Sequence, residues 1–121
     1  MGRTARKRGM VKQTYIPKRG DIVWVDFNPT KGHEQKGKRP AFVVSRRIYN
    51  EKSGLALLCP ITSQEKGYSF EVLIKCDKIQ GVVLSDQMRS VDWKERNVKF
   101  VAKSDISTIS EVLAKITALV R

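Results

Sequence analysis

The segment with sustained helical periodicity in this chain lies at its C-terminal end. Its apolar residues recur every three or four positions, at Ile106, Ile109, Val112, Leu113, Ile116, Leu119 and Val120. This spacing predicts an amphipathic helix over 106–120 with a single apolar face. Ser104 is its expected N-cap, and Asp105 would lie in the first turn, where the helix dipole favours a carboxylate. The rest of the chain must build its core from shorter elements.

Short apolar runs separated by turn residues predict strands for most of the remaining chain. The expected strands are residues 21–27, 40–45, 55–62, 70–74, 81–85 and 97–102. Pro40 begins one of them, where its missing N–H costs least. Residues 49–54 are expected to form a turn, and Asp92 to cap a single helical turn. Trp24 and Phe42 stand in predominantly apolar strands, so both are expected to pack in the core.

Short strands and one terminal helix predict a mainly β fold, a small and partly open antiparallel β-barrel with the helix covering one mouth or edge. A barrel of this size is filled by its own side chains, so a functional site must lie on a face or an edge. The chain of 121 residues suits one domain. Residues 1–14 are basic and lack acids, and we interpret them as a flexible arm preceding a domain over 15–121.

Positive charge is the strongest compositional signal. Lys and Arg number 24 against 12 Asp and Glu, which gives a formal net charge of +12. This excess favours a polyanionic partner, either nucleic acid or an acidic protein, over a role in solubility alone. No apolar run is long enough to span a membrane, and the N-terminus has no secretory h-region.

The cysteines and the single histidine limit the chemistry further. Cys59 and Cys76 stand in apolar segments, so we expect buried thiols in a reducing, cytoplasmic compartment. Two cysteines and one histidine are too few for a convincing zinc site, so neither a metal nor another cofactor is expected.

Three stretches of the sequence together resemble the MazF/PemK/Kid family of toxin endoribonucleases from type II toxin–antitoxin systems. They read "RGDIVWVDFNPTKGHEQKGKRPAFVVS", "LLCPITSQEKGYSFEV" and "GVVLSDQMRSVDW". The similarity runs from about residue 17 to the final helix and is strongest to the MazF branch. Its specificity comes from the combination of motifs, because a lone "RP" or "DQ" would carry no weight.

The resemblance implies an SH3-like barrel of the CcdB/PemK type that forms a homodimer. It implies sequence-specific, metal-independent cleavage of single-stranded mRNA or rRNA, leaving 2′,3′-cyclic phosphate and 5′-hydroxyl ends. It also implies a cognate antitoxin whose acidic, disordered tail binds across the RNA site. The alternatives are a non-catalytic toxin of the same fold that inhibits DNA gyrase, and a basic RNA-binding module.

Metal-free RNA cleavage needs a group that stabilises charge on the phosphoryl oxygens, together with proton transfer at two oxygens. Arg39 suits the first task, because its planar guanidinium is always charged and matches two phosphoryl oxygens. The resemblance pairs Arg39 with Thr62, whose hydroxyl can orient a phosphate. Glu34 would act as a general base, contact a base edge or pair with a nearby cation. The single histidine, His33, excludes a two-histidine mechanism within one chain and takes a supporting role.

Further residues are predicted to bind RNA or to support the site. Gln35 would fix the loop, and Tyr68 is the most plausible surface aromatic for base stacking. In related toxins, the aspartate of the "DQ" motif is the proposed base, with an arginine two residues earlier. Here Leu84 replaces that arginine, so Asp86 either binds RNA or, as we favour, pairs with Arg89. The other candidates are Ser63 and Gln87 and the cations Lys31, Lys36, Lys38, Arg46, Arg47 and Lys66.

Overall fold

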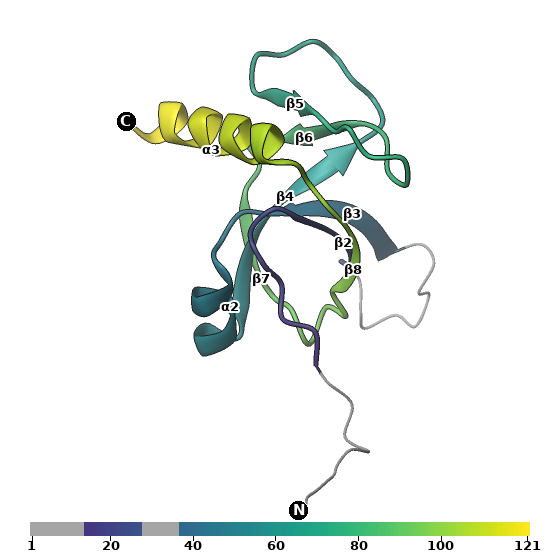
Figure 1. Cartoon of the computed structure of the whole chain (residues 1–121), viewed down its shortest axis with the longest axis vertical. Coiled ribbons are helices and arrows are strands. Elements are labelled where there is room, and N and C mark those ends of the chain that lie inside the picture. Colours follow the sequence, from purple (N-terminus) through teal and green to yellow (C-terminus); the bar gives the residue numbers. More distant parts are fainter. Residues whose placement is uncertain (1–13, 28–36) are drawn as a thin grey trace, which may run out of the picture.

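The computed structural model describes residues 14–27 and 37–121, which form an open, mostly antiparallel sheet with a helix at the C-terminal end (Figure 1). The strands are β2 (Asp21–Asp26), β3 (Lys38–Val43), β4 (Leu55–Thr62), β5 (Glu71–Leu73), β6 (Val82–Leu84), β7 (Arg89–Asp92) and β8 (Lys99–Lys103). Their order is β5-β6-β4-β3-β2-β8, and β7 also pairs with β4. The mainly β prediction is confirmed, and the sheet is not closed. The predicted basic arm lies almost wholly outside the described residues.

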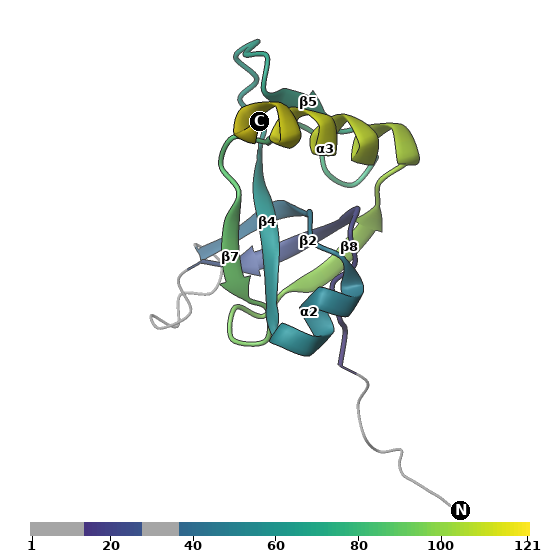
Figure 2. The same ribbon diagram turned by 90° about the vertical axis from the view of Figure 1, so that its left-hand side faces the viewer.

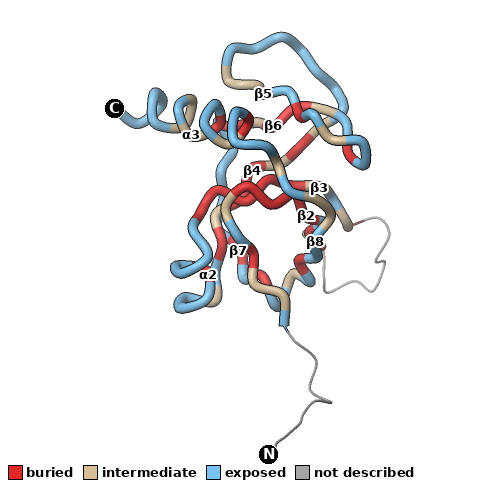
Figure 3. The backbone as a smooth tube through the Cα atoms, viewed as in Figure 1, coloured by how far each residue is buried: buried red, intermediate tan, exposed pale blue. Residues whose placement is uncertain are grey.

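The long strand β4 joins two parts of the sheet. It pairs with β7 through residues 55–58, with β3 through residues 58–60, and with β6 through Ile61 and Thr62 at its end. Successive residues of β2 enter different core clusters: Ile22 packs in one and Val23 in the other. Burial on both faces of the strand follows from its period-two pattern, and Figure 3 shows buried backbone concentrated where β2, β3 and β4 cross.

Helix α3 (Ile106–Val120) has the predicted bounds and lies across one end of the sheet (Figure 2). Val112 is fully buried in the cluster that contains Phe42. The N-cap is Asp105, not Ser104: its carboxylate accepts a hydrogen bond from the Thr108 amide at 2.9 Å, which lowers the pKa of Asp105. Ser104 is still held by the sheet, because its amide donates to the carbonyl of Gly20 at 2.8 Å. The N-cap therefore lies one residue later than predicted, while the bounds of the helix are as predicted.

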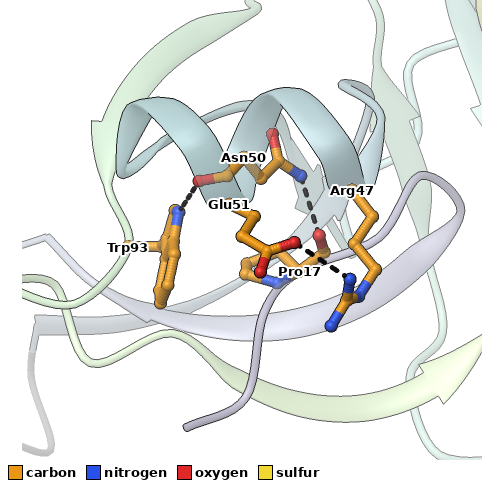
Figure 4. Close-up of polar contacts among 5 residues, drawn as sticks. All are labelled: Pro17, Arg47, Asn50, Glu51 and Trp93. Carbon is orange, nitrogen blue, oxygen red and sulfur yellow. Dashed lines mark hydrogen bonds and ion pairs between the residues drawn. The ribbon is translucent and has the colours of Figure 1, made fainter.

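The expected turn at 49–54 is wrong, because helix α2 (Arg47–Ser53) occupies most of it. Its fully buried Asn50 connects α2 to Pro17 and Trp93, both of which are distant in sequence (Figure 4). The Asn50 side-chain amide donates to the carbonyl of Pro17 at 2.8 Å, and its oxygen accepts from the Ser45 hydroxyl at 2.5 Å. The Asn50 carbonyl accepts from the Trp93 indole at 2.8 Å. These tertiary contacts stabilise a helix too short to be stable alone.

Smaller differences concern strand bounds and exposure. β3 begins two residues before Pro40, and β7 was not predicted. Phe42 is fully buried as expected, whereas Trp24 is 38% exposed, which corrects its assignment to the core. Asp92 caps a turn as predicted, since its carboxylate accepts from the amides of Lys94 and Glu95.

Both cysteines are free thiols. Cys59 is buried in β4, and desolvation raises its pKa to about 12. Cys76 is only half-buried and follows β5 instead of lying in a strand. Within 14–27 and 37–121, no helix combines the length and the apolar character needed to cross a membrane.

Candidate active site

A hollow of about 420 Å³ lies at the end of β4 and contains two of the predicted catalytic residues. It is lined by Trp24, Arg39, Pro40, Ile61, Thr62, Ser63, Gln64, Lys78, Ile79 and Gln80. On the right of Figure 1, the end of β4 lies between the β5–β6 connection and the beginning of β3. We call this space the Arg39 hollow.

Sheet register explains why Arg39 and Thr62 line the same hollow. β3 and β4 pair antiparallel from Ala41 opposite Pro60, and continuing that register places Arg39 opposite Thr62. Arg39 is exposed and is fixed on its other side by β2, where its Cα partner is Val25. A guanidinium on a paired strand has its backbone positioned by the sheet, so less ordering is needed when an anion binds.

Thr62 is the last residue of β4 and is half-buried. Its hydroxyl oxygen accepts a hydrogen bond from the Gln64 amide at 3.1 Å. A hydroxyl that accepts one hydrogen bond can donate its own proton to another acceptor, such as a phosphoryl oxygen. The turn after β4 therefore orients the Thr62 hydroxyl for such a contact.

Gly81 allows the β5–β6 connection to pack directly on Thr62. Its φ is +144°, and a Cβ built there would lie 2.2 Å from the Thr62 carbonyl oxygen and 2.8 Å from its carbon. No side chain fits in that space, because both neighbours are backbone atoms. The backbone of Gly81 thus packs closely against that of Thr62 and keeps one wall of the Arg39 hollow in place.

Gly81→Ala is expected to lower stability by about 2–4 kcal/mol and to reduce any activity of the site more than tenfold, since the clash must displace Thr62. The matched control is Gly67→Ala, where φ is +83° but nothing lies within 4 Å of the added Cβ. That control should cost only about 1 kcal/mol for the backbone conformation. Urea unfolding of the two variants checks the difference, and equal losses would contradict the packing argument.

A second, smaller hollow of about 160 Å³ adjoins the first. Its lining residues are Thr62, Gln64, Lys66, Tyr68, Phe70, Glu71, Leu84 and Gln87. Tyr68 is 53% exposed, as expected of a surface aromatic, and stacks on Phe70 with ring centroids 5.1 Å apart. The Glu71 carboxylate accepts from the Gly67 amide at 2.9 Å and fixes the intervening turn. The predicted Lys66, Tyr68 and Gln87 thus share this hollow with Thr62.

Arg46 and Arg47 lie apart from the Arg39 hollow, which corrects the predicted basic cluster. They line another hollow with Lys18 and Arg19, and Arg47 pairs with Glu51 at 3.2 Å. Their position follows from α2, which the sequence pattern did not predict.

The predicted ion pair between Asp86 and Arg89 is also wrong. Asp86 is exposed, and no ion pair joins it to Arg89, although both lie in the part of the chain that the structure describes. The Arg89 guanidinium instead lies 5.0 Å from the ring centroid of Phe27, in a cation–π contact. Lys38 begins β3, opposite Asp26.

Five predicted residues lie outside the described residues: Lys31, His33, Glu34, Gln35 and Lys36. Their assignments stay predictions from sequence. The part of the chain that the structure describes contains no group of three or more His, Cys, Asp or Glu residues placed to hold a metal. The expected independence from metal also stays a prediction.

Sequence reasoning missed Lys78 and Gln80 as residues of this site, and it preferred core packing over base stacking for Trp24. Trp24 reaches the hollow because its Cα partner on β3 is Pro40, the neighbour of Arg39. Lys78 and Gln80 reach it from the far side of β4, through a connection that follows β5. Only pairing register could have identified them, and no local pattern encodes it.

Comparison with known proteins agrees with this geometry. The family model described as a PemK-like, MazF-like toxin of type II toxin-antitoxin systems matches residues 18–120. The chain is 43% identical over 106 residues to the endoribonuclease toxin MazF of Escherichia coli K12, covering 88% of this chain and 96% of the relative. It is 37% identical over 117 residues to the endoribonuclease toxin ChpB of the same organism, covering 92% and 99%.

Solved structures give the same result. The crystal structure of MazF from Deinococcus radiodurans superposes with a TM-score of 0.78 at 42% identity, covering 88% of this chain and 98% of that one. A crystal structure of MazE-MazF from the same organism matches with a TM-score of 0.79 at 38% identity, covering 88% and 97%. The motifs, the sheet and these relatives agree, and the chain belongs to the family of PemK-like, MazF-like toxins of type II toxin–antitoxin systems.

Proposed function

We propose that this chain is a toxin that cleaves single-stranded RNA at specific sequences without a metal. The observation that carries the proposal is that Arg39 and Thr62, which come from separate motifs, line one hollow at the end of β4. The endoribonuclease relatives from E. coli support the reaction class. The formal charge of +12 supports a polyanionic substrate.

Cleavage proceeds by attack of a ribose 2′-oxygen on the adjacent phosphorus. The new bond joins the 2′-oxygen to phosphorus, and the bond from phosphorus to the 5′-oxygen breaks. One proton leaves the 2′-hydroxyl and one is added to the departing 5′-oxygen, so the products are a 2′,3′-cyclic phosphate and a 5′-hydroxyl. Neither water nor an oxidant is consumed in this step.

Arg39 and Thr62 act on the phosphoryl group during this step. Negative charge accumulates on the two non-bridging oxygens, and the guanidinium fork of Arg39 can donate to both. The Thr62 hydroxyl donates to one of them and fixes the orientation of the phosphate. Glu34 is assigned to proton removal or to a base-edge contact and His33 to a supporting role, both on the sequence motif alone.

Trp24 supplies a stacking surface beside Arg39. Its indole is partly exposed and lines the hollow together with Thr62. Stacking of a base on an aromatic side chain contributes about 1–3 kcal/mol to binding. We assign this ring to the base next to the scissile phosphate.

Trp24→Ala is expected to weaken RNA binding by about 5- to 150-fold, which is the stacking energy expressed as an affinity ratio. Trp24→Phe should retain most of the affinity because a ring remains. Tyr49→Ala is the control, since Tyr49 is an exposed aromatic on α2 that lines a different hollow. Fluorescence anisotropy with labelled RNA measures all three, and equal affinities for Trp24→Ala and Tyr49→Ala would exclude stacking.

The proposal extends to partners and location. Crystal structures of MazE-MazF from D. radiodurans support a cognate antitoxin, and we assign its acidic tail to the Arg39 hollow, where it would exclude RNA. We also propose a homodimer and action in the cytoplasm, where the RNA substrates are. The basic arm at residues 1–14 would add unspecific attraction to phosphates.

The test is incubation of the purified protein with long, mixed-sequence RNA in EDTA, followed by mapping of the new ends. We expect cuts at one short motif that leave 5′-hydroxyl ends and cyclic phosphates. A gyrase inhibitor of the same fold would leave the RNA intact and block DNA supercoiling. A basic RNA-binding module would retain the RNA in a gel without cutting it.

A further inference from the structure

The β5–β6 connection, residues 74–81, forms one wall of the Arg39 hollow. Lys78, Ile79 and Gln80 of this connection line the hollow together with Arg39 and Thr62. This wall comes from the opposite side of β4 to the wall that carries Arg39, because β4 lies between β6 and β3 in the sheet. Figure 1 shows the connection beside the end of β4.

The β5–β6 connection is held at its ends and near its centre. The Ile74 amide donates to the carbonyl of Gly81 at 2.9 Å, which closes the loop. Ile79 is only 8% exposed and belongs to the core cluster that contains Phe42. Gly81 packs against the backbone of Thr62. The backbone of Lys78, which precedes the buried Ile79, is therefore positioned before any ligand binds.

Charge around Lys78 favours an anionic ligand. Among the described residues that line the Arg39 hollow, Arg39 and Lys78 are cations and none is acidic. The neighbouring Asp77 and Lys75 line a different hollow. Within the described parts of the chain, Lys78 makes no ion pair. Two cations thus face one space from two walls, and none of the described residues that line this space is acidic.

The separation of the two walls indicates which phosphates they would bind. Neighbouring strands lie about 4.8 Å apart, so the backbones of β3 and β6 are about 10 Å apart with β4 between them. Arg39 lies on β3 and Lys78 in the connection that leads into β6, so their side chains start from opposite walls and suit two successive phosphates of one strand better than a single phosphate. A lysine ammonium binds phosphate as a point charge and reads no base.

We propose that Lys78 is a second phosphate-binding residue of this site, which holds the phosphate next to the scissile one while Arg39 contacts the scissile phosphate. This inference rests on the proposed function, since it assumes an RNA strand in the hollow. Lys78 then positions the strand and takes no part in proton transfer. Its removal should raise KM and leave kcat within about twofold, because binding is lost equally from substrate and transition state.

The experiment compares Lys78→Ala with Lys75→Ala, which removes the same charge from the same connection but from another hollow. Each protein is titrated with a mixed-sequence single-stranded DNA, which has no 2′-hydroxyl and is not cleaved, over a range of salt concentrations. Lys78→Ala should bind about fivefold more weakly, and the slope of log affinity against log salt should fall by about 0.7. Lys75→Ala should retain the wild-type slope, and Lys78→Arg should restore binding.

Two results would overturn the assignment of Lys78. One is equal affinity and equal salt slope for Lys78→Ala and Lys75→Ala. The other is a changed cleavage motif in mapped RNA products, because a residue that binds only phosphate leaves sequence preference unaltered. The titration does not depend on cleavage. If the wild-type protein binds the single-stranded DNA but leaves RNA intact in EDTA, the proposed reaction is refuted. The DNA affinities and salt slopes of the variants then still test whether Lys78 binds a phosphate.

Discussion

Replacement of Arg39 by alanine is expected to lower the rate of RNA cleavage by at least about 10²–10³-fold in a folded protein. This is the usual effect of removing one donor that stabilises charge in a transition state. Arg39 is exposed at the start of β3 and contributes nothing to either core cluster, so the fold should survive its loss. Single-turnover cleavage of a mapped RNA substrate in EDTA measures the rate.

Arg46→Ala is the matched control for this prediction. It removes the same charge from an exposed position, but Arg46 lines hollows near α2 and not the Arg39 hollow. We expect this variant to cleave RNA within about threefold of the wild type, with the difference arising from general attraction to phosphates. Arg39→Lys should fall between the two, because it keeps the charge and loses the planar fork. A folded Arg39→Ala variant with wild-type turnover would remove Arg39 from the mechanism.

Asn50→Ala is expected to lower the free energy of unfolding by about 2–4 kcal/mol. Asn50 is fully buried, and its side-chain amide satisfies the carbonyls of Pro17 and Ser45 at 2.8 and 3.2 Å. Alanine would leave these carbonyls and the Ser45 hydroxyl buried without a hydrogen-bond partner. Each unsatisfied group then lowers the free energy of unfolding by its desolvation penalty. The loss should also detach residues 14–20 from α2, since Pro17 is their contact with Asn50.

Glu51→Ala is the control for Asn50→Ala, on the same helix and one residue away. Glu51 is exposed and pairs with Arg47 four residues earlier, as Figure 4 shows. Such a surface pair contributes less than about 0.5 kcal/mol. Urea unfolding with a common m-value separates the two variants. Similar midpoints would mean that Asn50 does not hold this part of the fold.

The elements predicted well from sequence are those with a strong local period. The helix over 106–120 was predicted with its bounds, because its apolar spacing continues through four turns of one face. β4 was predicted with its bounds as well, since a continuous apolar run with a terminal Thr62 marks a buried strand. In both cases, local sequence and tertiary burial favour the same structure.

The elements missed are those stabilised by contacts distant in sequence. α2 has exposed Ile48 and Tyr49 and no amphipathic pattern, and its stability depends on the hydrogen bonds of Asn50 with Pro17 and Trp93. The N-cap of α3 was predicted as Ser104 and is Asp105. The amide of Ser104 donates a hydrogen bond to the carbonyl of Gly20, which retains Ser104 at the end of the sheet.

The candidate site was predicted in part for the same reason. Motifs identified Arg39 and Thr62, and antiparallel register between β3 and β4 brought them together. Trp24 lies within a motif but was assigned to the core, and Lys78 lies in none; they reach the hollow through strand pairing and the β5–β6 connection. A spacing rule cannot find such residues, because their neighbours are decided by which strands pair.

The most direct test of the central claim is cleavage of one mapped RNA site after a single 2′-deoxy substitution at the nucleotide before the scissile phosphate. The reaction contains EDTA, and the unmodified RNA is the reference. Our account predicts that the modified site is not cut while its binding is retained, because the 2′-oxygen is the nucleophile. Cleavage of the modified site at the original rate would show that another nucleophile acts, and the mechanism assigned to Arg39 and Thr62 would be wrong.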